Sequence, residues 1–236
     1  MEAIVKLQSV TKDYGKGNVI VHALRGIDLE LAKGSFVAVA GPSGSGKSTL
    51  LNVISGLDRP SSGKVLVDGK DVGAMTRSQL SRLRLMRIGF VFQSYNLLPV
   101  LTAYENAEYV LMMQGVPAAK RRERVMALLA EVGLSGMEKR FPRELSGGQQ
   151  QRVAIARAIA SEPALVLADE PTANVDSKTA GALLDLMSKL NEEKNVSFLF
   201  STHDRRVMKR ARRLIILTDG AISQNGTAAE LTEEDE

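Results

Sequence analysis

The segment from Gly41 to Ser48, with the sequence GPSGSGKS, constrains this chain more than any other part of it. It fits the phosphate-loop pattern G-x-x-x-x-G-K-[ST] at every fixed position. The five residues before it, Phe36 to Ala40, are all apolar, which predicts a buried strand. The residues after it, Thr49 to Ile54, contain no helix breaker and place Leu50 and Ile54 on one helical face. The motif therefore stands in the context it requires, a strand, a glycine-rich loop and a helix.

This context predicts that the loop binds the phosphates of a nucleoside triphosphate. Glycines allow consecutive backbone N–H groups to point inward, and the N-terminus of the following helix adds partial positive charge. We expect Lys47 to reach the β- and γ-phosphates and the hydroxyl of Ser48 to ligate Mg²⁺. The alternative, a plain Gly/Ser-rich surface loop, does not account for the flanking segments.

The composition is that of an ordinary globular protein. The 236 residues are 44% hydrophobic and 25% charged, which suffices for one core with a lobe inserted into it. The sequence has no cysteine, which excludes disulfides, thiolate metal sites and thiol catalysis. No apolar run approaches ~18 residues, and the first residues lack the basic and apolar regions of a secretion signal. We therefore expect a cytoplasmic protein.

The formal net charge of +4 is unevenly distributed. Basic residues gather in a first basic cluster (Lys120, Arg121, Arg122 and Arg124) and a second basic cluster (Arg205, Arg206, Lys209, Arg210, Arg212 and Arg213), whereas residues 230–236 are mostly acidic. Such clusters can contact nucleic acid or anionic headgroups, but more often they form the solvated faces of helices. No aromatic residues are interleaved with them, which weakens an interpretation as a single-strand-binding surface.

The hydrophobic pattern predicts an α/β core that carries a helical insertion. Over residues 1–93, strands are expected at 3–10, within 19–31, at 64–67 and at 88–92. Turns are expected at 15–18 and 68–69, and an amphipathic helix at 77–87. Residues 100–160 are predicted to be helical, with a capping box at Thr102 and Glu105, a helix from Pro117 to Gly133, and another over 147–160. Strands at 164–168, 196–200 and 214–217 then alternate with helices at 177–191 and 204–211, which is typical of a parallel sheet with right-handed crossovers.

An apolar run beginning at Ala164 ends in two carboxylates, Asp169 and Glu170. A buried strand that delivers acids to its carboxyl end, near a phosphate loop, is typical of a Walker B element. We expect Asp169 to hold Mg²⁺, through water, and Glu170 to polarise the water that attacks the γ-phosphate. The alternative is a pair of acids that opens a turn before Pro171.

The segment Leu145-Ser146-Gly147-Gly148-Gln149 places a serine and two glycines directly before a long helix. This is a second helix N-terminus suited to an anion. Taken alone, Ser146 is explained equally well as a plain N-cap.

Together these motifs resemble those of the nucleotide-binding subunits of ABC transporters, in which Leu-Ser-Gly-Gly-Gln is the signature, and the similarity extends over essentially the whole chain. The resemblance implies one ABC ATPase domain, 1–236, with a P-loop NTPase (RecA-like) core of mixed and parallel sheet. An N-terminal antiparallel β layer belongs to this core, which comprises 1–93 and 161–236. An inserted α-helical subdomain, 94–160, carries the signature.

The resemblance also implies roles for single residues in binding ATP and Mg²⁺. Tyr14 would stack on adenine, and Gln93 would sense Mg²⁺ and the attacking water. Asp176 would be the aspartate of the D-loop, and His203 the switch histidine on the γ-phosphate. The remaining nucleotide contacts would come from Gly41, Pro42, Ser43, Gly44, Ser45, Gly46, Lys47, Ser48 and Thr49, and, across a subunit interface, from Ser146, Gly147, Gly148 and Gln149. The sequence suggests no role for His22.

In this family two subunits face each other head to tail around two ATP molecules. A chain with one copy of each motif would therefore act as a homodimer, closing on ATP binding and reopening after hydrolysis. The strings GFVFQ (89–93), NLLP (96–99) and LTA (101–103) resemble the branch that serves lipoprotein-release, macrolide-efflux and FtsX-like permeases. Ala173 departs from the branch, which usually has glycine there. The permease would dock near residues 94–110 and choose the cargo, placing the chain on the inner face of the cell membrane.

Two other functions stay open at this point. Some ABC-type ATPases act on DNA, but they usually insert long coiled coils in the helical lobe, and this chain has no sustained heptad pattern. We therefore expect no nucleic-acid partner; DNA binding that weakens steeply with salt would reverse this expectation. A regulatory cassette without hydrolysis would normally have lost Glu170 or His203, and both are present.

Overall fold

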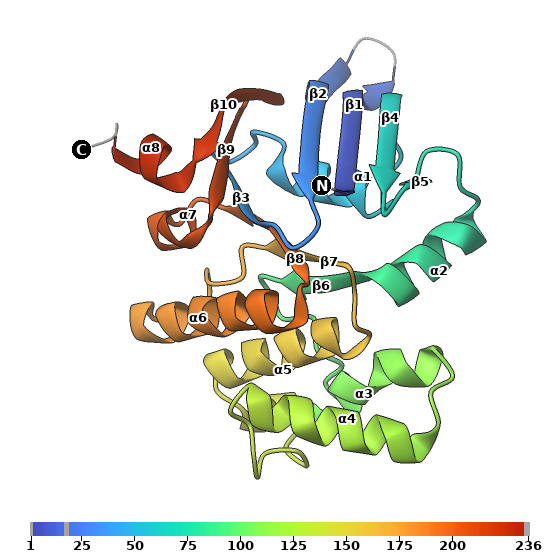
Figure 1. The fold of residues 1–236 in the computed structure, drawn as a ribbon, viewed down its shortest axis with the longest axis vertical. Helices are drawn as coiled ribbons and strands as arrows, with labels where there is room; N and C mark the ends of the chain where they lie inside the picture. Colours follow the sequence, from blue (N-terminus) through green and yellow to red (C-terminus); the bar gives the residue numbers. More distant parts are fainter. Residues whose placement is uncertain (1, 17–18, 234–236) are drawn as a thin grey trace.

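The computed structural model describes residues 2–16 and 19–233, and it is built on two sheets with helices between and below them (Figure 1). The first sheet is antiparallel, with the order β2-β1-β4-β5. Its strands are β1 (Ala3–Lys16), β2 (Val19–Ala32), β4 (Ser62–Val67) and β5 (Lys70–Asp71). The predicted N-terminal antiparallel layer is thus confirmed.

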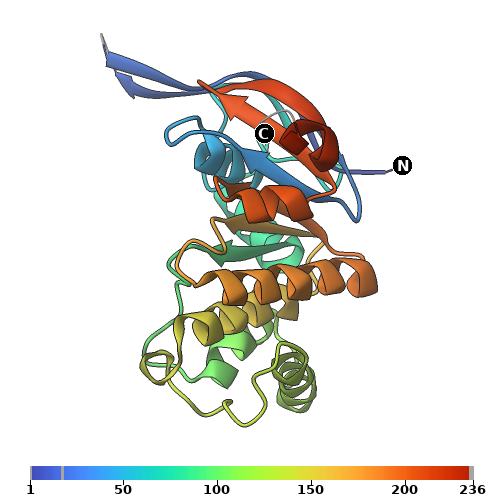
Figure 2. The ribbon, with the colours of Figure 1, turned by 90° about the vertical axis from the view of Figure 1, so that its left-hand side faces the viewer.

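The strand β1 is longer than the apolar alternation predicted. It pairs with β2 as far as Lys16, so Gly15 and Lys16 belong to the strand rather than to a turn, while Gly17 and Asn18 lie outside the described residues. Residues 11–16 carry little apolar alternation because this end of the β1–β2 pair projects from the body of the molecule, as Figure 2 shows. A strand without a buried face leaves no period of two in the sequence.

The second sheet has the order β10-β9-β3-β8-β7-β6, and all its strands are parallel except β10. They are β3 (Phe36–Ala40), β6 (Ile88–Phe92), β7 (Leu165–Asp169), β8 (Ser197–Thr202), β9 (Arg213–Thr218) and β10 (Ala221–Thr227). The continuous apolar runs in β3 and β7 reflect burial on both faces, which is usual for parallel strands.

Each face of this second sheet belongs to a different core. Val37 and Val39 of β3 pack with the antiparallel sheet and with Leu50 and Ile54 of α1 (Lys47–Ile54). Phe36 and Ala38 pack on the opposite side, with α5 (Gly147–Ala160) and α6 (Ser177–Lys194). The helix that follows the phosphate-loop motif is therefore held between the two sheets.

The remaining helices are α2 (Arg77–Arg87), α3 (Ala103–Met113), α4 (Ala118–Glu131), a 3₁₀ turn at Pro142–Glu144, α7 (Arg205–Arg210) and α8 (Ala228–Glu233). Helices α3, α4 and α5 form the helical part at the bottom of Figure 1. The capping box of Thr102 and Glu105 is present. No described helix combines the length and the hydropathy that a membrane crossing needs.

The parallel arrangement decides where the predicted site residues lie. Because β3, β8, β7 and β6 are neighbours and run in one direction, the residues that follow them emerge at one edge of the sheet. These residues are Gly41, His203, Glu170 and Gln93, in that spatial order.

Candidate active site

The loop 41–48 lies between β3 and α1, and its glycines are required by close contacts. Gly41 has φ 150°, and a Cβ there would lie 2.1 Å from the carbonyl oxygen of Leu217. Gly46 has φ 101°, and a Cβ there would lie 2.4 Å from the carbonyl oxygen of Ala23. Helix α1 has neither a side-chain cap nor an acidic residue in its first turn. Its N-terminal N–H groups are therefore available to an anion.

Lys47 is buried, and its ammonium lies within the loop. Its Nζ donates to the carbonyl oxygens of Gly41 (2.8 Å) and Pro42 (2.9 Å). The hydroxyl of Ser45 is buried without a hydrogen-bond partner among the described residues. Unpaired donors and a cation beside an open helix N-terminus suit a phosphate group.

A pocket of about 400 Å³ opens over this loop. Its lining includes Gly44, Gly46, Lys47, Ser48 and Thr49 of the loop and α1, and Tyr14 and Val21 of the β1–β2 pair. The structure thus brings the predicted aromatic Tyr14 to the same pocket as the predicted phosphate loop, although Lys47 lies 33 positions after Tyr14 in the chain.

Three oxygen-bearing side chains meet at the carboxyl end of β7. Ser48 Oγ donates to Asp169 Oδ1 at 3.1 Å, and the buried hydroxyl of Ser201 donates to the same oxygen. A hydroxyl and a carboxylate side by side are the hard oxygen ligands that Mg²⁺ prefers. Ser48 and Asp169 could therefore hold this ion, whereas no hydrogen bond joins the side chain of Gln93 to either of them within the described residues.

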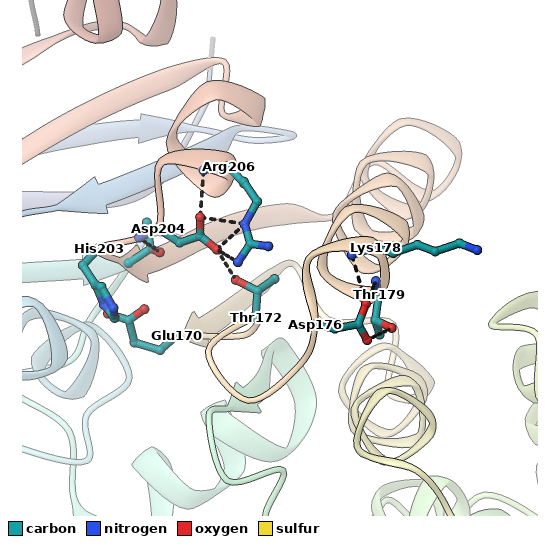
Figure 3. A network of polar contacts seen from close by, with 9 residues as sticks. Glu170, Thr172, Asp176, Lys178, Thr179, His203, Asp204 and Arg206 are labelled. Carbon is teal, nitrogen blue, oxygen red and sulfur yellow. Dashed lines mark hydrogen bonds and ion pairs between the residues drawn. The ribbon is translucent and has the colours of Figure 1, made fainter. Parts of the chain in front are cut away.

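Glu170 and His203 face each other at the ends of β7 and β8, as Figure 3 shows. His203 Nδ1 lies 2.7 Å from Glu170 Oε1. Glu170 has φ 47°, in the left-handed region, and its N–H donates to the carbonyl oxygen of Ser201 at 3.0 Å. A non-glycine residue held in this region is a candidate for function.

A second network lies next to this pair. Asp204 accepts a hydrogen bond from the hydroxyl of Thr172 (3.2 Å) and ion-pairs with Arg206 (2.8 Å) (Figure 3). Burial raises the pKa of Asp204, but the hydrogen bonds from Arg206 outweigh burial and leave this pKa below its ordinary value. The network fixes the segment after Glu170 to the segment after His203.

Asp176 is the N-cap of α6. Its carboxylate accepts the N–H groups of Lys178 and Thr179, each at 3.0 Å, and the hydroxyl of Thr179 at 2.5 Å. These bonds, with the Thr179 hydroxyl as the largest cause, hold the pKa of Asp176 below its ordinary value. Thr179 also packs against the signature segment, because a Cβ at Gly148 would lie 2.5 Å from Thr179 Cγ2.

The signature residues 146–149 stand apart from the phosphate pocket of their own chain. None of them lines that pocket. Ser146 caps α5 by accepting the N–H of Gln149 at 3.3 Å, and Gln149 Oε1 accepts the N–H of Ser146 at 2.9 Å. The plain N-cap interpretation is therefore correct as a local description, and it leaves the exposed face of this segment available to another molecule.

The segment that begins at Gln93 is tied to the segment after β7. Asn174 Nδ2 donates to the carbonyl oxygen of Gln93 at 2.9 Å, and Tyr95 Oη donates to the carbonyl oxygen of Asn174 at 3.1 Å. Arg157 of α5 donates to the carbonyl oxygen of Tyr95 at 2.9 Å. The side chain of Gln93 itself is exposed.

Several residues at this edge were not predicted from the sequence. Ser201, Thr172 and Asp204 support the acids and the histidine, and Val21 lines the pocket over the loop. Serine and valine are common in strands and threonine is common in turns, so no pattern distinguishes these residues. Asp204 had one indication, its position beside His203 at the end of a predicted strand.

A phosphate-binding loop, a metal-type carboxylate and an acid–histidine pair on one edge of a parallel sheet define a nucleotide-hydrolysing cassette. Comparison with known proteins agrees. Residues 24–173 match the family model of the ABC transporter. An ABC transporter ATP-binding protein of Thermotoga maritima is 47% identical over 222 residues, which are 94% of each chain.

Two further relatives carry more specific names. The lipoprotein-releasing system ATP-binding protein LolD 1 of Rhodopseudomonas palustris is 44% identical over 94% of this chain and 100% of its own. The macrolide export ATP-binding/permease protein MacB of Marinobacter nauticus is 46% identical over 97% of this chain, which corresponds to only 35% of MacB.

Among solved structures, the ATP-binding cassette MJ0796, bound to ADP and Pi as a dimer after hydrolysis, superposes with a TM-score of 0.88. It is 42% identical and covers 95% of this chain and 98% of its own. The chain belongs to the ABC transporter family, as one of its ATP-binding proteins, and is an ABC ATPase. The predicted ABC ATPase fold is confirmed by the same comparison.

Proposed function

We propose that two copies of this chain bind two MgATP between them and hydrolyse ATP to drive a permease of the MacB, LolD or FtsX-like kind. The observation that carries the proposal is the Glu170–His203 pair, which lies 2.7 Å apart on the sheet edge that also bears Lys47 and the Ser48–Asp169 contact. The cargo would be a lipoprotein, or a drug or peptide for efflux.

In this proposal, ATP lies in the pocket over the loop 41–48. Tyr14 stacks on the adenine, the backbone N–H groups of the loop and Lys47 bind the phosphates, and Thr49 adds a contact. Ser48 and Asp169 would hold Mg²⁺, with Gln93 as a further candidate ligand, and the bound ion would neutralise phosphate charge.

Glu170 acts as the general base for hydrolysis. It takes a proton from a water whose oxygen bonds to the γ-phosphorus, while the bond from that phosphorus to the β–γ bridging oxygen breaks. His203 holds the Glu170 carboxylate through Nδ1 and contacts the γ-phosphate. General-base assistance of this kind contributes about 10²–10⁴ in rate.

The second copy completes the site. Since residues 146–149 do not reach the pocket of their own chain, they are proposed to contact the γ-phosphate held by the partner. Asp176 borders the same interface at the N-terminus of α6. The dimeric state of the MJ0796 cassette supports a dimer of this chain. Residues 94–160 would then act as the helical subdomain against a core of 1–93 and 161–236.

The permease is proposed to occupy an apolar groove between α2, β6, α3 and α5. This groove has a volume of about 650 Å³, and its lining includes Phe90, Phe92, Val110 and Met113 as well as Arg82 and Arg157. Val110 and Asn96 of the lining fall in the predicted docking range 94–110. An amphipathic segment with an apolar face and an acidic residue would match this surface.

Nucleic acid has no part in the proposal, because much of the basic surface is neutralised internally. Arg121 and Arg124 of the first basic cluster pair with Glu108 and Glu162. In the second basic cluster, the arginines that pair with carboxylates include Arg206, Arg210 and Arg212. The chain would instead stand at the inner face of the membrane through its permease, in line with the name of MacB, which joins an ATP-binding part to a permease.

The permease assignment is tested by co-expression with a candidate permease of the MacB, LolD or FtsX-like kind. We expect the two to co-purify and the permease to raise the ATPase rate. Met113→Glu should abolish co-purification while leaving the ATPase rate of the isolated chain unchanged, because a charge would enter the groove. Met126→Glu, at an exposed methionine on α4 outside the groove, is the control. Retention of the permease by Met113→Glu would contradict the docking site.

A further inference from the structure

One carboxylate, that of Asp58, holds both the hydroxyl of Tyr14 and the cation above its ring. Tyr14 Oη donates to Asp58 Oδ2 at 2.6 Å. Lys12 Nζ donates to Asp58 Oδ1 at 2.7 Å and to the carbonyl oxygen of Arg59 at 2.9 Å. The same Nζ lies 4.7 Å from the centroid of the Tyr14 ring. Asp58 thus holds the hydroxyl end of the Tyr14 ring, and the ammonium of Lys12 covers one face of the ring.

The burial of this group distinguishes it from an ordinary surface ion pair. The side chain of Lys12 is 12% exposed and that of Asp58 is 30% exposed. Burial raises the pKa of Tyr14, and its hydrogen bond to Asp58 raises it further. Ion pairs shielded in this way are ordered, whereas exposed pairs seldom hold a geometry.

Asp58 is in turn fixed to the helix that carries the phosphate loop. The N–H groups of Leu57 and Asp58 both donate to the carbonyl oxygen of Asn52 in α1, at 3.0 and 3.1 Å. Helix α1 begins at Lys47, so the turn that carries Asp58 is hydrogen-bonded to the helix that follows the phosphate loop. On the strand side, the register of β1 shifts between Lys12 and Asp13, which re-aims the side chains that follow.

We infer that Asp58 and Lys12 are positioning residues that hold the Tyr14 ring as a preformed platform for the nucleotide base, at a distance from the phosphate loop set by α1. This inference rests on the proposed binding of a nucleotide. Because Lys12 occupies one ring face, the base stacks on the other. Fixing the ring before binding removes the entropy that ordering it would cost.

The inference separates base recognition from phosphate recognition, so two ligands test it. MgADP carries both parts and is not hydrolysed, whereas inorganic pyrophosphate with Mg²⁺ carries only the second. When an aromatic side chain that stacks on a base is truncated to alanine, the affinity falls about 5- to 150-fold. Tyr14→Ala should weaken MgADP within that range, Asp58→Ala about threefold to tenfold, and neither should change the Kd of pyrophosphate.

The experiment is isothermal titration calorimetry of the full chain with both ligands. The matched control is Glu30→Ala, which removes an exposed carboxylate of β2 that pairs with Lys6 of β1. In the Tyr14→Ala background, Asp58→Ala should cause no further loss of MgADP affinity. Tyr14→Phe keeps the ring and removes only the hydroxyl, so it should weaken the binding of MgADP less than Tyr14→Ala does. If Asp58→Ala does not fold, Tyr14→Phe replaces it in the test.

Three outcomes would overturn the inference: Asp58→Ala that binds MgADP as tightly as the wild type, losses that are equal for MgADP and pyrophosphate, or additive losses in the double variant. As long as the wild type binds MgADP, none of these three outcomes would contradict the proposed function. A wild type that binds neither ligand would contradict the proposed function as well.

Discussion

His203 reaches back from the end of β8 to Glu170 at the end of β7, with Nδ1 and Oε1 2.7 Å apart. The two side chains differ in exposure, since that of His203 is 71% exposed and that of Glu170 only 15%. A shielded acid oriented by an exposed imidazole can hold a water on one side while the outer ring nitrogen meets a phosphate. The pair therefore joins the proposed base to the proposed γ-phosphate contact.

Replacing His203 by alanine should slow hydrolysis without preventing binding. We expect kcat to fall about 10²- to 10³-fold, because Glu170 loses its orienting partner and the γ-phosphate loses a donor. The Kd for MgADP, which has no γ-phosphate, should change less than about twofold. Steady-state kinetics and calorimetry measure the two effects.

Arg212→Ala supplies the control for this substitution, because Arg212 also pairs with a carboxylate, that of Glu192, and does not line the pocket over the loop. At saturating ATP, Arg212→Ala should keep the wild-type kcat. A kcat for His203→Ala within threefold of the wild type would contradict the role of His203.

Lys47→Ala should weaken nucleotide binding itself. The ammonium is buried in the loop, and hydrogen bonds to charged groups are worth about 1.5–3 kcal/mol, so the Kd for ATP should rise about 10- to 150-fold. Lys189→Ala, on the exposed face of α6, should bind like the wild type. Unchanged ATP affinity in Lys47→Ala would show that the loop does not hold the phosphates.

Gly148→Ala should disturb the contact between the signature segment and α6. The new Cβ would overlap Thr179 Cγ2, and overpacking costs about 1–3 kcal/mol, against about 1 kcal/mol gained by removing glycine from a helix. We expect a net loss of up to about 2 kcal/mol in the free energy of unfolding.

Thr179→Ser in the same chain should restore this stability, because serine lacks Cγ2 and keeps the hydroxyl that binds Asp176. Urea unfolding of both single variants and the double variant measures the rescue. If the double variant were no more stable than Gly148→Ala, the steric explanation would be wrong.

The contacts of Asp58 with Lys12 and Tyr14 should make the free energy of unfolding depend on pH. Burial raises the pKa of Asp58, but the hydrogen bonds from Lys12 and Tyr14 outweigh it and hold the pKa below the ordinary value of 3.8. A lowered pKa stabilises the folded state above the unfolded pKa, and this contribution is lost as the pH falls through the folded pKa.

The difference in unfolding free energy between the wild type and Asp58→Asn should therefore be constant from pH 7 to about pH 5 and shrink below pH 3.8. Urea titrations at each pH measure it. A difference that already vanished between pH 7 and pH 5 would contradict the lowered pKa.

The sequence predicted well which site residues lie together at the carboxyl ends of the parallel strands. Apolar runs such as 36–40 and 164–168 identify these strands because they are buried on both faces, and the residues that follow parallel strands emerge at one edge of the sheet. The sequence did not predict β10 and α8, since 221–227 is mostly polar and lies at the edge of the sheet. Nor could it predict the contacts of Ser201 with Asp169 or of Asp58 with Tyr14. Such pairs join residues far apart in the chain, and neither partner type is unusual at its position.

Two copies of the chain should close around ATP, and Glu170→Gln isolates this step because it removes the base while keeping the size of the side chain. Analytical ultracentrifugation with MgATP should show a dimer containing two ATP molecules, and with MgADP a monomer. The double variant Glu170→Gln with Ser146→Arg should stay monomeric, because the signature segment could no longer approach the partner's nucleotide. A Glu170→Gln protein that binds MgATP and yet remains a monomer would contradict the account.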